Sequence, residues 1–233
     1  MAKTKQLRWY FSLRSPYSWF AYRELLAQHP DVLDAAEWLP VWEPDEWTTR
    51  LLADEGVHSL PYTDMSKAKA LYILQDTRRL AAARGLSMTW PVDTAPVWEV
   101  AHLGYLAALD GNRGREFVAA TYRARWEHGR DISDPAVIAE VAAQVGLDAE
   151  RVAGAHRDPV YRARGVEQLK LVDRQGVFGV PMFLHGRNKF WGVDRLPDFI
   201  ASVRGSGLPE PEPVDGPVVL GVGADAGHAG GCG

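Results

Sequence analysis

A short polar segment stands where side-chain chemistry is favoured. Ser15-Pro16-Tyr17-Ser18 follows a strand-like run over Gln6–Leu13 and precedes a helix expected over about 17–28. The free N–H groups and the dipole of a helix N-terminus stabilise a negative charge. A serine hydroxyl there cannot form a disulfide and is a poor nucleophile without a base, but it can donate a hydrogen bond to an anion. The alternative is purely structural, with Ser15 as an N-cap before a proline in the first turn.

A second motif lies far along the chain. Gly176-Val177-Phe178-Gly179-Val180-Pro181 comes immediately before a strand expected over Met182–His185. If the Val180–Pro181 bond is cis, the Val180 backbone faces outward and can pair with an extended peptide or a thiol ligand. Most X–Pro bonds are trans, so the local sequence alone leaves the isomer of this bond open.

The elements that must position these motifs form an α/β pattern. The first strand and helix are followed by a strand over 36–42, and a hairpin over 182–191 precedes a last helix over about 193–203. Between them, residues 44–176 contain residues typical of helix starts and ends and no strand-like runs. Asp134-Pro135, Asp158-Pro159 and Thr94-Ala95-Pro96 are typical of helix starts, and Gly85, Gly146 and Gly176 of helix ends.

Composition narrows the class of protein. The chain has 233 residues, a formal net charge of −4 and 46% hydrophobic residues, which fits a soluble globular protein and argues against nucleic-acid binding. We expect no membrane span and no signal peptide. The single cysteine, Cys232, excludes an internal disulfide and fits the cytoplasm, and no metal site is expected. Residues 205–233, rich in Pro, Gly and acidic side chains, are expected to be a flexible tail.

Together these segments resemble one branch of the DsbA-like thioredoxin superfamily, that of 2-hydroxychromene-2-carboxylate isomerases and kappa-class glutathione transferases. In thioredoxin-like folds a Cys-x-x-Cys pair occupies the place of Ser15–Ser18, so the spacing is kept and both sulfurs are gone. The resemblance extends over about residues 6–203. It implies a thioredoxin-like domain of residues 1–43 and 177–204 with a large all-helical insertion, residues 44–176. The segments that carry it are Trp9-Tyr10-Phe11, Ser15–Trp19, Lys69–Tyr72 with Asp76, Gly176–Pro181 and Phe190–Leu196.

The resemblance also implies roles for single residues. Ser15 would donate to the thiolate of glutathione and lower the thiol pKa. The resemblance implies a cis-Pro181, and Val180 before it would pair with the cysteinyl backbone of the tripeptide. Asp194 would accept from its ammonium group and Lys69 would meet a carboxylate. Structural alternatives are a helix cap for Asp194 and an exposed helix face for Lys69.

Two positions depart from the family pattern. Val193 is one of the predicted cofactor-binding residues, and the family usually has Ser or Asn at its position. Val57 or His58 stands near a position where the family usually has Asn. The richness in Ala, Gly and Arg hints at a high-GC bacterial source, where another low-molecular-weight thiol could replace glutathione.

The substrate would lie between the serine segment and the helical insertion. Tryptophans there can offer stacking surface, although tryptophans are more often core residues. His58 and His102 are candidate proton shuttles, with a structural histidine as the alternative for each. The residues predicted to line the substrate pocket are Arg14, Tyr17, Ser18, Trp42, His58 and Trp90.

The resemblance implies a thiol-assisted cis-trans isomerase of a C=C bond in an unsaturated carbonyl compound. Such a substrate would belong to aromatic catabolism or secondary metabolism, free or attached to a carrier protein, and the enzyme would be a homodimer. Two alternatives stay open. A glutathione or other thiol S-transferase would keep the thiol on the product, and a non-catalytic thioredoxin-like protein would only bind an extended peptide or a carrier.

Overall fold

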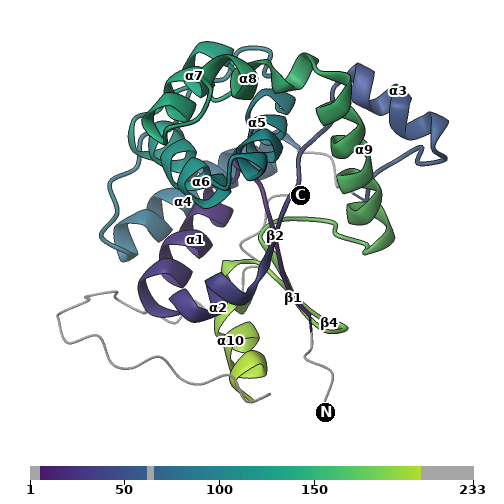
Figure 1. Cartoon of the computed structure of the whole chain (residues 1–233). Helices are drawn as coiled ribbons and strands as arrows, with labels where there is room; N and C mark the ends of the chain where they lie inside the picture. Colours follow the sequence, from purple (N-terminus) through teal and green to yellow (C-terminus); the bar gives the residue numbers. More distant parts are fainter. Residues whose placement is uncertain (1–5, 62–65, 206–233) are drawn as a thin grey trace.

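The fold is described from a computed structural model, which covers residues 6–61 and 66–205. Its centre is a four-stranded sheet in the order β2-β1-β3-β4 (Figure 1). β1 (Leu7–Phe11) pairs in parallel with β2 (Glu37–Pro40) and antiparallel with β3 (Met182–His185), which forms a hairpin with β4 (Asn188–Trp191). This is the thioredoxin-like arrangement that the sequence predicts.

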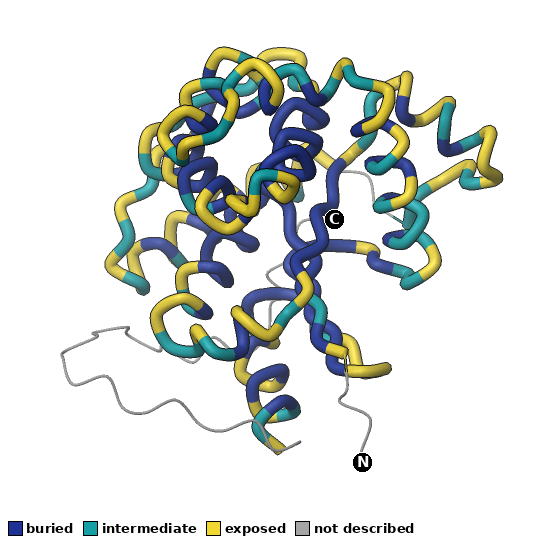
Figure 2. Tube along the Cα trace, viewed as in Figure 1, coloured by how far each residue is buried: buried dark blue, intermediate teal, exposed yellow. Residues whose placement is uncertain are grey.

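Both faces of the sheet are covered, because successive side chains of a strand point to opposite faces. Trp9 and Phe11 of β1 face the large core, which also holds α1 (Pro16–Gln28) and α10 (Leu196–Arg204). Tyr10 faces the other way, into a smaller cluster with Val172 of α9 (Pro159–Arg174). Figure 2 shows most of β1, β2 and β3 as buried, whereas β4 at the sheet edge and the outer helix faces are more exposed.

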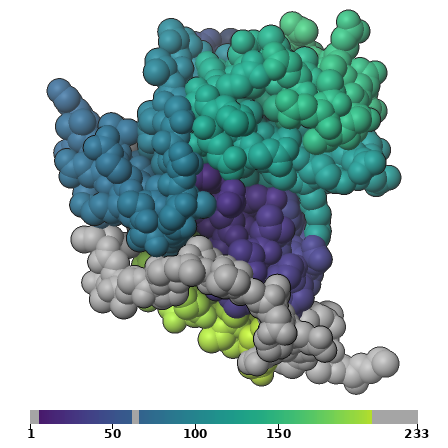
Figure 3. All heavy atoms as spheres, turned by 90° about the vertical axis from the view of Figure 1, so that its left-hand side faces the viewer, coloured from purple at the N-terminus to yellow at the C-terminus, as the bar shows by residue number. Residues whose placement is uncertain are grey.

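The helical part lies between β2 and β3 in the chain. It surrounds the N-terminal segment: in Figure 3 the blue residues that include α4 and the teal helices that follow enclose the purple α1 region from two sides. No described helix is long and apolar enough to cross a membrane. The remaining helices of this part are α3 (Glu46–Asp54), α4 (Lys67–Ala83), α5 (Glu99–Asp110), α6 (Gly114–Tyr122), a π-helix (Arg123–Glu127), α7 (Pro135–Gln144), α8 (Ala149–Gly154) and a 3₁₀ turn (Ala155–Arg157).

Most of the predicted helix boundaries are confirmed. Asp134 and Asp158 are N-caps whose carboxylates accept backbone N–H groups of the first turn, with proline next in each case. Gly176 follows α9 with a φ of 56°, the left-handed conformation that ends many helices. The prediction at Thr94–Pro96 is wrong: no helix begins there, Ala95 has a φ of 48°, and α5 starts at Glu99.

One short helix was not predicted. α2 (Pro30–Ala35) follows α1 directly, and its N-cap His29 makes no side-chain capping bond. A six-residue helix without a capping side chain carries little local signal, because most of its stability comes from packing. Val32 and Leu33 supply that packing, since both are buried in the large core. The predicted flexible tail lies outside the described residues, except for Gly205.

Candidate functional site

Ser15 caps α1 and keeps its hydroxyl hydrogen for another partner. Its backbone is extended, with φ −88° and ψ 121°, and its Oγ accepts the N–H of Ser18 at 3.2 Å. Pro16 occupies the first turn, where no N–H is needed. This capping bond uses a lone pair of the oxygen and not its hydrogen, so Ser15 can cap the helix and donate to an anion together. The structural and the functional reading are therefore compatible.

The serine loop, residues 12–15, is a tight turn between β1 and α1. The Ser15 N–H donates to the carbonyl of Ser12 at 3.1 Å. The N–H of Ser12 in turn donates to Oγ of Ser18 at 3.2 Å, and the hydroxyl of Tyr122 donates to the Ser12 carbonyl at 3.2 Å. Ser15 itself is 1% exposed. The position of its oxygen is thus set by several buried hydrogen bonds.

The ring of His102 lies under this loop. Nδ1 is 2.7 Å from the carbonyl oxygen of Trp98, which can only accept, so Nδ1 carries the proton. Nε2 then accepts the N–H of Leu13 at 3.1 Å and faces Oγ of Ser12 at 3.2 Å. Burial, with Arg14 and Arg125 nearby, lowers the pKa of His102 to about 3. A neutral ring without exposed surface does not suit the predicted proton shuttle.

The Val180–Pro181 peptide bond is cis, which confirms the prediction for Pro181. Tyr10 of β1 pairs with Met182 of β3, so the antiparallel register brings Pro181 to the end of β1, where the serine loop begins. Both Val180 and Pro181 are buried. The two motifs, far apart in sequence, meet at one end of the sheet.

The other predicted cofactor residues lie on elements packed against α1. A 3₁₀ turn, Val193–Arg195, follows β4 and contacts α1, with Val193 buried and Asp194 half-buried. α4 also packs on α1, and Lys69 is half-buried in its first turn. These placements leave the roles of Lys69, Val180, Val193 and Asp194 in holding a cofactor as predictions.

The predicted pocket residues divide by exposure. Arg14 is partly exposed: its guanidinium lies 5.3 Å from the ring centre of Trp98 and its Nη1 is 3.1 Å from Oε2 of Glu43. His58 is exposed in the loop after α3, and Trp90 is 43% exposed, edge-on to Trp126. Arg14 is therefore a partly exposed cation next to Ser15 in the chain, and its charge is paired with Glu43.

Three other predicted pocket residues are buried. The Tyr17 hydroxyl donates to Oδ2 of Asp76 at 2.7 Å, which joins α1 to α4. The Oγ of Ser18 accepts the N–H of Ser12 in the serine loop, as described. Trp42 is 1% exposed and stacks on His102, with ring centres 5.3 Å apart. The expectation of an open stacking surface at Trp42 is corrected: this indole belongs to the core.

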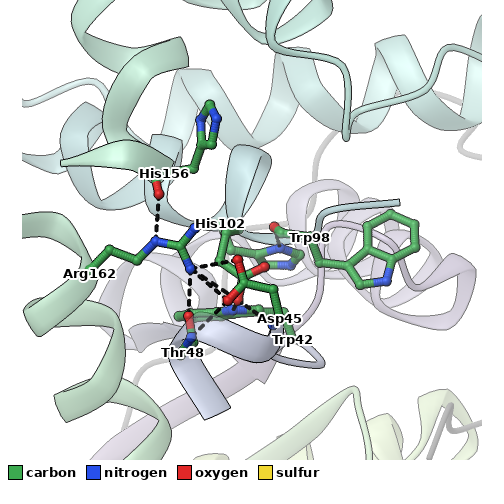
Figure 4. Close-up of polar contacts among 8 residues, drawn as sticks. Trp42, Asp45, Thr48, Trp98, His102, His156 and Arg162 are labelled. Atoms are coloured by element: carbon green, nitrogen blue, oxygen red, sulfur yellow. Dashed lines mark hydrogen bonds and ion pairs between the residues drawn. The ribbon is translucent and has the colours of Figure 1, made fainter. Parts of the chain in front are cut away.

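Sequence reasoning missed a buried ionic cluster next to these rings (Figure 4). Arg162 of α9 is paired with Asp45 at 2.8 Å and with Glu99 at 3.7 Å, and its Nη1 donates to Oγ1 of Thr48. Burial raises the pKa of Glu99. Arg162 and Asp45 are 117 positions apart, so no local pattern could have joined them.

A surface groove of about 250 Å³ lies between α1 and the α6 segment, and no described residue of the serine loop lines it. Its walls include Trp19, Tyr22, Leu26 and Tyr122. Among the described residues no cluster of three or more His, Cys, Asp or Glu side chains could hold a metal ion. The candidate site is thus the serine loop with cis-Pro181, and its donors suit an anion.

Comparisons with known proteins agree with this arrangement. A family model described as a DsbA-like thioredoxin domain matches residues 6–203. A 2-hydroxychromene-2-carboxylate isomerase from Sphingobium xenophagum is 29% identical over 200 residues, which are 85% of this chain and 97% of that protein. This relationship supports an isomerase-like function.

Solved structures share the fold. A 2-hydroxychromene-2-carboxylate isomerase has a TM-score of 0.65 at 21% identity, covering 86% of this chain and 94% of that one. The cytosolic disulfide reductase DsbM from Pseudomonas aeruginosa, solved with GSH, has a TM-score of 0.56 at 20% identity, covering 86% of this chain and 98% of the other.

Proposed function

The chain belongs to the DsbA-like thioredoxin domain family, and from this premise we propose that it is a thiol-assisted cis-trans isomerase. Its substrate would be an unsaturated carbonyl compound whose C=C bond changes geometry, as the name of the isomerase relative suggests. The observation that carries the proposal is the hydrogen bonding of Ser15. Its oxygen caps α1 as an acceptor, so its hydroxyl hydrogen can be donated to a ligand, at the position where related folds have a redox cysteine.

The residues present fit a bound thiol. The N-terminus of α1 suits an anion: no acidic side chain occupies its first turn, and Arg14, which is paired with Glu43, lies beside Ser15. A hydroxyl donor and a helix N-terminus both favour the charged form of a thiol and lower its pKa. Glutathione is the first thiol to test, since a neighbour of the same fold was solved with it.

A bound thiol supplies a sulfur that adds to the electron-poor carbon of the C=C bond, lets the resulting single bond rotate, and leaves again with its electron pair. Ser15 donates to the charged sulfur before and after this exchange and is not consumed. Arg14 would stabilise negative charge that develops on the carbonyl oxygen of a substrate bound beside the serine loop. Val180 and Asp194 would help to orient the thiol.

This chemistry explains why a serine is suitable. A thiol that must attack and then leave works best with a pKa near the ambient pH. A cysteine at position 15 could exchange with the disulfide form of the cofactor, forming a mixed disulfide and releasing one cofactor thiolate, whereas a serine can tune the thiol without reacting with it. The proposal places the protein in a compartment where free thiols are abundant, such as the cytoplasm.

The test is to incubate the protein with a cis-configured α,β-unsaturated ketone or acid, with and without glutathione. We expect conversion to the trans isomer only with the thiol, while the amount of free thiol stays constant. A stable adduct that consumes the thiol would identify a transferase instead. If neither product forms with any cellular thiol, the protein is a binding module and the proposal is wrong.

A further inference from the structure

We propose that His102 is a positioning residue, which holds the serine loop from the helical part and so fixes where Ser15 presents its hydroxyl. The inference rests on the proposed function only in that Ser15 acts on a thiol. The ring is fully buried and touches the loop two and three residues before Ser15. It therefore does not meet the reacting atoms itself.

The contacts of Nε2 are made to the part of the loop that determines its path. The Leu13 N–H at 3.1 Å is a backbone donor that no other described group accepts. Ser12, whose Oγ lies 3.2 Å from Nε2, also accepts the Ser15 N–H through its carbonyl. A movement of residues 12 and 13 is therefore transmitted to Ser15 through one short turn.

The orientation of the ring is fixed on two further sides (Figure 4). The Nδ1–H donates to the carbonyl of Trp98, one turn earlier in the chain. The flat face lies on Trp42, with an angle of 20° between the rings, and the indole N–H of Trp42 donates to Oε1 of Glu99 at 3.3 Å. Both ring nitrogens are hydrogen-bonded and one face is stacked, so the ring is held in one orientation.

The support continues into the ionic cluster. Oε1 of Glu99 also accepts the backbone N–H of Asp45 at 2.7 Å, at the start of α3. Arg162 of α9 is the cation that is paired with both carboxylates. His102 is thus the last member of a chain of contacts that joins α3, α5 and α9 to the serine loop.

The charge state suits this role. A pKa of about 3, caused first by burial and then by Arg14 and Arg125, keeps the ring neutral at physiological pH. The hydrogen bond to the Trp98 carbonyl raises the pKa of His102, but by less than burial and the two arginines lower it. Nε2 therefore keeps its lone pair for Leu13, and the ring neither stores nor transfers a proton.

Two substitutions separate positioning from packing. His102→Gln keeps a side-chain acceptor for the Leu13 N–H, whereas His102→Phe keeps an aromatic ring of similar size without any nitrogen. We expect His102→Phe to lower kcat/KM for the thiol by about tenfold, the size of one lost buried hydrogen bond, with KM for the unsaturated substrate unchanged. His102→Gln should recover most of this loss.

A control variant separates a general loss of stability from a loss of positioning. Phe199→Leu lies in the same large core but on α10, away from His102, and weakens the fold by packing alone. If Phe199→Leu lowers kcat/KM for the thiol as much as His102→Phe at equal loss of stability, or if His102→Gln is no better than His102→Phe, the positioning role is wrong.

A measurement that needs no activity keeps the inference independent of the proposed function. In the wild-type protein with labelled histidine, we expect nitrogen shifts of His102 that stay those of a neutral Nδ1–H ring from about pH 5 to about pH 8. Amide exchange at residues 12–15 should accelerate in His102→Phe while other helices stay protected. A ring that titrates in this range, or unchanged exchange in the variant, would overturn the inference even if the isomerase assay succeeds. Should that assay fail with the wild type, these two readouts still decide it.

Discussion

Replacing Ser15 by alanine removes a helix cap and, in the proposed function, a donor to the thiolate. The lost bond to the Ser18 N–H is expected to cost about 1 kcal/mol of unfolding free energy, as for other N-caps. In a chain of this length that lowers Tm by about 2–4 °C. A hydrogen bond to a charged group contributes about 1.5–3 kcal/mol, so thiol-dependent turnover should fall about 10- to 150-fold.

The two losses can be separated. Asp134 caps α7 before Pro135 just as Ser15 caps α1 before Pro16, and Asp134→Ala should lower Tm similarly and leave turnover unchanged. Ser15→Asp provides the reverse case: its carboxylate can still accept the Ser18 N–H, but it has no hydrogen to donate at neutral pH and repels a thiolate. Because position 15 is 1% exposed, the buried carboxylate should lower stability although the capping bond is kept, and we expect Ser15→Asp to be nearly inactive.

The assay is thermal unfolding together with the rate of C=C isomerisation at saturating and limiting thiol. Equal turnover in Ser15→Ala and the wild type would refute the role of the hydroxyl. Equal losses of turnover in Ser15→Ala and Asp134→Ala would show that only helix stability matters.

Further predictions concern the frame around the site. Arg162→Met leaves buried carboxylates without their cation and should cost about 3–5 kcal/mol in chemical unfolding; a loss below about 1 kcal/mol would contradict the ionic role. Gly165→Ala should destabilise the protein although alanine favours helices, because the added Cβ would lie 2.7 Å from a methyl group of Leu103; a higher Tm would show that the neighbours yield. The hydrogen bond from Arg204 lowers the pKa of Asp31, so this pair stabilises the fold above the carboxyl's unfolded pKa and is lost as the pH falls through the folded one. Asp31→Asn at this partly exposed pair should lose less than about 1 kcal/mol at neutral pH, and the difference from the wild type should disappear as the pH falls through the lowered pKa of Asp31; a difference that stays constant in acid would contradict the linkage.

The parts of the fold that the sequence predicts are those with local signals. The cap of α1 lies within four residues, and the hairpin of β3 and β4 has its turn residues between two short apolar runs. The cis isomer of Pro181 could be predicted only because the segment Gly176–Pro181 resembles that of a family in which this proline is cis. At Thr94–Pro96 the same kind of signal fails, since Ala95 takes a left-handed conformation and the chain turns without starting a helix.

The support of the site could not be predicted, because its members are distant in sequence. His102 reaches Leu13 across 89 positions and Glu99 reaches Trp42 across 57. Nothing near His102 in the sequence distinguishes a buried acceptor from a proton shuttle; burial and the carbonyl of Trp98 decide it. Trp42 is likewise a core residue through contacts distant in sequence, with His102, Glu99 and the surroundings of Gly165.

The central claim is that the serine loop holds a thiol in its charged form. The most direct measurement is a pH titration of the thiolate absorbance of protein-bound glutathione, from about pH 5 to about pH 9, beside free glutathione. We expect the bound thiol to ionise at least about one pH unit below the free thiol. Ionisation at the same pH in both samples, or no binding of glutathione or any other cellular thiol, would contradict it.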